Sequence, residues 1–364
     1  MQKQVYKELI VAIIDYTKKF IGPVAMTQAA RIKGITILGK GEKIEIEGED
    51  YQRIINDLIA LYTSLFGPSA LTLARNGARQ VLEKNPGLKV PSGLREFSSE
   101  IRFKKIKTAL VSAVIFVLTC VSIYVFMPSD SPLFTLVTDI LFIIIGLGVS
   151  ITVFYASKSF GFSSKEGKVW LYLSIGFFLW CLGDFFWAYN ELVLKTNPFP
   201  SIADISYIVS YVFFIAGFLY ELRIIKESIT KKEVIKSSIL VLFAALASIY
   251  FVLIPIAYSS EYDILSKIIS LFYPIIDFVM LFFLFLLFFT FKDVFNYAKI
   301  SRSWLILSVS FILILVADSL FAYFEWGYSY TGIYLVLCDL VWLIGYIMFA
   351  FGAFYHSHIF KGEA

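Results

Sequence analysis

The chain has 364 residues, of which 59% are hydrophobic and 18% aromatic, and its mean hydropathy is +0.77. Soluble domains carry about 25% charged residues, against 16% here, so the composition excludes an ordinary soluble protein. The formal net charge of +4 gives no support to nucleic-acid binding. Three cysteines lie in apolar stretches without zinc or disulfide spacing, so neither a metal nor a cofactor is expected.

The first 85 residues predict a small, mostly helical cytoplasmic domain. Hydrophobic periodicity favours helices and one β-hairpin in this order: helices over 3–20 and 24–32, strands over 35–38 and 43–47 around Gly39–Gly41, and helices over 49–65 and 68–84. The segments 20–31 and 65–76 share a Gly-Pro step and two alanines at an offset of 45 residues. We therefore expect residues 1–85 to contain an internal duplication of a helical hairpin.

Residues 86–107 are predicted to form a linker and a basic collar before the first membrane span. Eight apolar stretches then follow, each long enough to cross a hydrocarbon core of about 30 Å: 108–127, 133–155, 169–189, 201–222, 235–257, 264–291, 303–323 and 333–355. The sixth stretch is overlong and contains Pro274, where a kink or an interfacial start is expected.

The membrane part repeats itself. Residues 170–191 align with 304–325 with ten identities in 22 positions, and 204–220 aligns with 339–355. The matched polar positions are Asp184/Asp318, Glu191/Glu325, Asp204/Asp339 and Tyr211/Tyr346, and Asp139 corresponds to Asp277. The expected fold class is an all-α polytopic membrane protein with two parallel four-helix repeats, 108–230 and 231–364.

The loop charges predict the orientation. Lys and Arg gather in the collar, in the loops after the second, fourth and sixth spans, and in the C-terminal tail. The other four loops carry only Lys195 and Lys267. By the positive-inside rule, both termini are expected in the cytoplasm of a prokaryotic cell, with the protein in its plasma membrane.

Six aspartates lie in the outer half of the predicted spans: Asp139, Asp184, Asp204, Asp277, Asp318 and Asp339. A carboxylate near a helix N-terminus is stabilised by free N–H groups, and Ser201 with Asp204 has capping-box spacing. This structural interpretation covers Asp204 and extends to Asp139, Asp277 and Asp339. It does not cover Asp184 or Asp318, which lie near helix C-termini.

The functional alternative is an outward-opening pocket. Asp184 and Glu191 lie seven residues apart and share one helix face, as do Asp318 and Glu325. Such a pocket suits a cation, a proton-sensing switch or a polar molecule stacked on aromatic rings. The candidate ligand-binding residues are Asp184, Glu191, Asp204, Asp318, Glu325, Asp339, Trp187, Tyr189 and Tyr323. By contrast, Tyr207, Tyr211, Trp342 and Tyr346 are interpreted as packing residues, and His356 and His358 as a hydrated cytoplasmic end.

The run GDxxWA at 183–188, PFPSxAD at 198–204, Tyr207, Tyr211 and Gly217 resembles multi-span sensory modules of prokaryotic diguanylate cyclases and histidine kinases. In the second half, YPIID at 273–277 and ADxxFAY at 317–323 extend the resemblance to about 108–355. The resemblance implies an input domain that binds a ligand. The cyclase and kinase motifs are absent, so we expect the output to pass through residues 1–85 to a cytoplasmic protein partner.

Two other functions stay open. Gly-Asp in the third span and Ala-Asp in the seventh are similar to the lysoplasmalogenase family of membrane hydrolases. That resemblance implies Asp184 as general acid or base and Asp318 as its partner, so whether the chain is an enzyme is left open. Parallel repeats also occur in small-solute transporters. The expected partners are the lipid bilayer and the cytoplasmic protein, with a homodimer left open and no nucleic acid.

Overall fold

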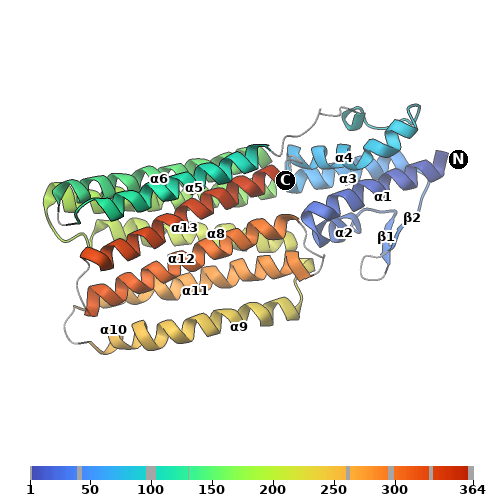
Figure 1. Cartoon of the computed structure of the whole chain (residues 1–364). Coiled ribbons are helices and arrows are strands. Elements are labelled where there is room, and N and C mark those ends of the chain that lie inside the picture. Colours follow the sequence, from blue (N-terminus) through green and yellow to red (C-terminus); the bar gives the residue numbers. More distant parts are fainter. Residues whose placement is uncertain are drawn as a thin grey trace.

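The computed structural model describes residues 2–38, 43–95, 104–129, 131–259, 263–293, 299–327 and 331–359. A small N-terminal domain lies at one end of a bundle of long helices (Figure 1). We call that end of the bundle the junction end, and the opposite end the distal end. The predicted hairpin turn at 39–41 and residues 96–103 of the predicted linker and collar lie outside the described residues.

The N-terminal domain has the predicted order of elements. They are α1 (Gln2–Ile21), α2 (Pro23–Ala29), β1 (Ile35–Leu38), β2 (Lys43–Ile46), α3 (Tyr51–Phe66), α4 (Pro68–Lys84) and a 3₁₀ turn, η1 (Ser92–Arg95). The strands pair antiparallel, with Ile35 opposite Ile46. α1 packs against α4, and α3 also packs against α4, around a core that includes Leu9, Ile13 and Leu58.

The two Gly-Pro steps have the same backbone conformation. Gly22 has φ 63° and ψ −135°, and Gly67 has φ 62° and ψ −153°. This region of backbone space is accessible almost only to glycine. In each case the next helix begins at the following proline, which suits the first turn because proline has no N–H to satisfy.

The bundle contains eight helical stretches long and apolar enough to cross a membrane, as predicted. Its elements are α5 (Lys104–Phe126), α6 (Pro132–Phe160), α7 (Lys165–Ala188), η2 (Tyr189–Leu194), α8 (Ile202–Ile225), η3 (Lys226–Ser228), α9 (Lys231–Ser248), η4 (Ile249–Leu253), α10 (Ile254–Tyr258), α11 (Ile264–Asp293), α12 (Lys299–Gly327) and α13 (Gly332–Ile359). The segments η2 and η4 are π-helical and continue α7 and α9. α11 passes through Pro274 as one helix.

Six of the eight spans form a closed ring. In order around the ring, the neighbours are α6, α7, α8, α11, α12 and α13, and α13 returns to α6. The remaining spans are peripheral: α5 packs on α13, and α9 packs on α11. Accordingly, only 11% and 17% of these two spans are buried, against 39–56% for the ring helices. The second to fourth span of each repeat therefore build the core.

The N-terminal domain docks on the junction end of the bundle. α1 meets α12, and α3 meets α7. The Ser69 hydroxyl donates to the carbonyl of Ser159 at 3.3 Å, and Gly67 lies directly against the carbonyl of Phe160. On the other side, Arg31 forms an ion pair with Glu227 in η3. Backbone and side-chain contacts therefore join the two parts.

Candidate functional site

A cavity of about 350 Å³ lies inside the ring at the distal end. It reaches the helix connections, because Ser129 and Asn197–Phe199 line it. Seven carboxyl groups line its wall: Asp139, Asp184, Glu191, Asp204, Asp318, Glu325 and Asp339. None of its described lining residues is Lys, Arg or His. The volume falls in the range of small-molecule sites, about 300–1,000 Å³.

Most of these acids accept a hydrogen bond from an aromatic side chain, in pairs related by the internal repeat. The Tyr207 hydroxyl donates to Asp184 Oδ1 at 2.8 Å, and Trp342 Nε1 donates to Asp318 Oδ1 at 2.6 Å. Tyr207 and Trp342 occupy matching positions of the two repeats, 135 residues apart. A Cβ on Gly183 would lie 2.4 Å from the Tyr207 ring, which explains why glycine precedes Asp184.

The second pair of acids is Asp204, in the first turn of α8, and Asp339, seven residues past the start of α13. Asp204 accepts from the Tyr273 hydroxyl at 2.7 Å, and Asp339 accepts from the Tyr124 hydroxyl at 2.8 Å. Asp204 also completes the predicted capping box, since its Oδ2 accepts from the backbone N–H of Ser201 at 2.7 Å. In both repeats, this aspartate accepts a hydrogen bond from a tyrosine hydroxyl, although Tyr273 and Tyr124 do not occupy matching positions.

The third pair breaks the symmetry. Asp277 Oδ1 accepts from the Tyr211 hydroxyl at 2.7 Å, whereas no described residue hydrogen-bonds to its Oδ2. The carboxyl group of Asp318 lies nearby. The counterpart of Asp277 is Asp139, which is 8% exposed, and among the described residues none hydrogen-bonds to its Oδ2.

The helix-terminus interpretation was right for Asp204 and wrong for three other aspartates. α6 begins at Pro132, α11 at Ile264 and α13 at Gly332. Asp139, Asp277 and Asp339 therefore lie beyond the first turn of their helices, whose free N–H groups would stabilise them. Asp277 and Asp339 are instead stabilised by hydrogen bonds from tyrosine hydroxyls of other helices.

The structure brings together seven of the nine candidate ligand-binding residues. These are Asp184, Glu191, Asp204, Asp318, Glu325, Asp339 and Trp187. Tyr189 and Tyr323 do not line the cavity and are 43% and 38% exposed. Asp139 was not among the candidates. Tyr207, Tyr211, Trp342 and Tyr346, which were interpreted as packing residues, also line it.

Glu191 reaches the cavity from an unusual segment. It lies in η2, the π-helical continuation of α7, and accepts from Trp187 Nε1 at 3.1 Å. π-helical turns are rare and occur frequently at functional sites. The two aromatic residues Trp187 and Phe321 meet edge to face at 6.0 Å and close one side of the cavity.

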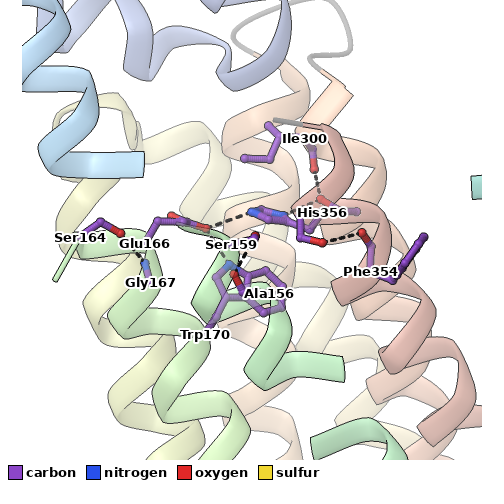
Figure 2. Close-up of polar contacts among 11 residues, drawn as sticks. Ala156, Ser159, Ser164, Glu166, Gly167, Trp170, Ile300, Phe354 and His356 are labelled. Atoms are coloured by element: carbon purple, nitrogen blue, oxygen red, sulfur yellow. Dashed lines mark hydrogen bonds and ion pairs between the residues drawn. The ribbon is translucent and has the colours of Figure 1, made fainter. Parts of the chain in front are cut away.

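A second buried polar cluster lies at the junction end. Figure 2 shows His356 extending from α13 towards Glu166 on α7. The His356 Nε2 and Glu166 Oε1 atoms are 2.9 Å apart, and both side chains are fully buried. His356 Nδ1 lies 2.9 Å from the Ser303 hydroxyl, and the buried carboxyl group of Glu221 lies near Glu166. The expectation that His356 lies in a hydrated end was wrong, because α13 continues to Ile359 under the N-terminal domain.

An aromatic pair separates this cluster from the cavity. Trp170 and Trp304 stack at 6.2 Å and occupy matching positions of the two repeats. Trp170 Nε1 donates to Glu166 Oε1 at 2.9 Å. Farther towards the distal end, Phe177 contacts both Trp180, which lines the cavity, and Phe349. Packed aromatic rings therefore lie next to the junction cluster and next to the cavity, at two levels of α7.

Among the described residues, no group of three or more His, Cys, Asp or Glu side chains is placed to hold a metal ion. Comparison with protein-family models, curated proteins and solved structures finds no match to this chain.

Proposed function

We propose that this protein is a membrane receptor that binds a small ligand in the distal cavity and signals through its N-terminal domain. In this proposal, the cavity faces the outside of a plasma membrane, and both termini lie in the cytoplasm. The concentration of Lys and Arg in the junction-end loops supports this orientation. The resemblance of 108–355 to prokaryotic sensory modules agrees with an input role, and a cytoplasmic protein would bind residues 1–85.

One observation carries the proposal: the same two helices reach both the cavity and the N-terminal domain. α7 carries Asp184 at the cavity and meets α3 at the junction, whereas α12 carries Asp318 and meets α1. The helices α7 and α12 correspond in the two membrane repeats. The helices that they meet each precede a Gly-Pro step of the same conformation. Corresponding helices of the two membrane repeats therefore contact corresponding helices of the N-terminal domain.

The helix α7 can act as a mechanical link between the junction cluster and the cavity. Glu166 and Asp184 are eighteen residues apart on α7, which corresponds to about 27 Å along an α-helix. A ligand that favours one packing of α7 against α12 would shift the position of α3 relative to α1. Packed cores have discrete arrangements, and a ligand changes their populations only by its differential affinity.

The experiment that tests the coupling fills the cavity without any ligand. Thr138 lines the cavity and is 5% exposed, so Thr138→Phe places a ring inside it. Ile140→Phe is the matched control, because Ile140 lies on the same helix and is 44% exposed. Amide hydrogen exchange is measured over 2–84 for the full chain in nanodiscs.

We expect Thr138→Phe to change exchange in the parts of α1 and α3 that meet the bundle, and Ile140→Phe to leave it unchanged. The thermal unfolding temperature verifies that each variant is folded. If a folded Thr138→Phe protein has the exchange pattern of the control, the cavity is not coupled to the N-terminal domain and the receptor proposal is wrong.

A second candidate function is an aspartate-dependent lipid hydrolase. The observation in its favour is that Asp184 and Asp318 line one cavity, each oriented by an aromatic donor at a matching position. A paired general acid and base needs this kind of fixed carboxyl geometry. The test is turnover of lysophospholipid and lysoplasmalogen by the purified protein. Turnover that persists in both Asp184→Asn and Asp318→Asn would exclude these residues as the catalytic pair.

A further inference from the structure

The cavity has a strong imbalance of charge. Its wall holds seven carboxyl groups, and no described lining residue supplies a positive charge. Carboxylates buried in a low-dielectric site need a counter-charge or a proton. Some of this requirement is met within the protein, because Asp318 accepts a hydrogen bond from Trp342. The rest of the wall must be neutralised in another way.

The need for a counter-charge is greatest around Asp139. Asp139 and Asp184 each have a buried carboxylate oxygen with no hydrogen-bond partner among the described residues, and both line the cavity. These side chains are 8% and 7% exposed. Asp139 interacts electrostatically with Glu191, Asp339 and Asp184. Carboxyl groups from α6, α7, η2 and α13 therefore line one cavity, within electrostatic range of Asp139.

The internal repeat shows that this arrangement is specific to the first half. At the matching position, Asp277 accepts a hydrogen bond from the Tyr211 hydroxyl of the first repeat and does not line the cavity, although its Oδ2 also has no described hydrogen-bond partner. The residue that corresponds to Tyr211 is Tyr346, and both tyrosines line the cavity. Asp277 therefore has a tyrosine donor and lies away from the cavity, whereas the equivalent carboxyl group of Asp139 faces an occupant.

The surroundings of Asp139 are aromatic. Phe142 lies one turn farther along α6 and meets Trp342 edge-on at 6.5 Å and Tyr346 edge-on at 6.3 Å. Trp180 stacks on Tyr346 at 5.4 Å, and all four rings line the cavity. Aromatic faces next to carboxylates attract an organic cation through both charge and cation–π interaction.

We propose that the ligand of the distal cavity is a small organic cation, an amine or quaternary ammonium compound, whose charged group lies at Asp139. Asp184 and Glu191 supply further negative charge, and the rings of Trp180, Trp342 and Tyr346 contact its apolar body. This assignment of the ligand class rests on the receptor function proposed above. A bare metal ion fits less well, since no described group of three acids is placed to hold one.

The test uses the full chain in nanodiscs and probes of similar size but different charge. The probes are benzyltrimethylammonium, benzyl alcohol and phenylacetate, with calcium chloride as the metal probe. Binding is measured from the shift in unfolding temperature, which grows with ligand concentration for any ligand of the folded state, and from tryptophan fluorescence. The variants are Asp139→Asn and, as a matched control, the repeat-equivalent Asp277→Asn.

We expect benzyltrimethylammonium to bind and the neutral and anionic probes not to bind. Asp139→Asn should weaken that binding at least about tenfold, because a buried charge loses its counter-charge. Asp277→Asn should retain the affinity within about threefold, because Asp277 lies outside the cavity wall. Equal losses in both variants, or no binding of the ammonium probe, would overturn the assignment.

The outcomes separate this proposal from the receptor function. Binding of benzyl alcohol, phenylacetate or calcium in place of the ammonium probe would overturn the cation class and leave the receptor function standing. Cation binding in a protein whose Thr138→Phe variant does not alter the N-terminal domain would support the cation site and refute signalling.

Discussion

Replacement of Gly67 by alanine should release the N-terminal domain from the bundle. A Cβ built on Gly67 would lie 1.4 Å from the carbonyl oxygen of Phe160, which is a bonded distance, so no side-chain adjustment relieves the clash. The residue also has φ 62° and ψ −153°, which costs a non-glycine residue about 1–3 kcal/mol. A further cost of about 1–3 kcal/mol is expected from overpacking, because the start of α4 must withdraw from the end of α6.

Gly48→Ala is the matched control for this prediction. Gly48 also has a positive φ, 111°, but a Cβ there meets no atom within 4 Å. The control therefore includes the backbone strain, about 1–3 kcal/mol, and none of the clash. The difference between the two variants reports the contact between the domain and the bundle.

The assay is amide hydrogen exchange of the full chain in nanodiscs, together with thermal unfolding. In Gly67→Ala, exchange should increase on both sides of the contact, in the first turn of α4 and the last turn of α6. In Gly48→Ala, any increase should remain near the strand β2. If the two variants are indistinguishable at α6, the docking of Gly67 on Phe160 is wrong.

Three further predictions concern single side chains. Glu166→Gln and His356→Gln should each destabilise the protein by about 3–5 kcal/mol, because each leaves a buried partner unpaired. Chemical unfolding of the double variant should show a loss smaller than the sum of the two single losses. Strict additivity would mean that the pair does not interact. Burial, with a smaller contribution from a nearby acid, raises the pKa of Tyr62 above its usual value, so its contribution to stability is present below pH of about 10 and is lost as the pH rises. Tyr62→Phe should therefore lose less stability than the wild type between neutral and alkaline pH, and parallel melting curves would contradict this. Trp342→Phe removes the donor to Asp318 Oδ1 and should lower the free energy of unfolding by about 1–3 kcal/mol, whereas an unchanged unfolding midpoint would show that the bond contributes nothing.

The eight spans and the N-terminal elements were predictable because they depend on local patterns. Apolar length defines a span, and periodicity with a Gly-Pro step defines the helices around Gly67. The repeat also gave the fold class, since each half contains an even number of spans. The order of helices around the ring was not predictable, because all the spans have similar apolar surfaces, and the peripheral position of α5 and α9 depends on packing alone.

The acidic residues of the site could be predicted from the sequence, but their hydrogen-bond donors could not. An aspartate in an apolar helix is visible in the sequence, but its hydrogen-bond donor comes from another helix. The repeat offset does relate Tyr207 to Trp342, which was a usable signal for two donors. Nothing in the sequence distinguishes Asp139 from Asp277, since the difference depends on which tyrosine reaches which carboxylate. For His356, no sequence pattern indicates its partner, Glu166, which lies 190 residues away.

The different surroundings of Asp139 and Asp277 have a consequence for how such a protein can arise by gene duplication. If the ancestor was a half-length chain that formed a dimer with a true twofold axis, both copies of this aspartate had identical surroundings. Such a dimer cannot give one carboxylate a tyrosine donor and leave the other without one, because every substitution occurs twice. Fusion of the two copies into one chain removes that restriction. One half can then specialise in holding the bundle together and the other in recognition, which is a reason for a duplicated gene to remain fused.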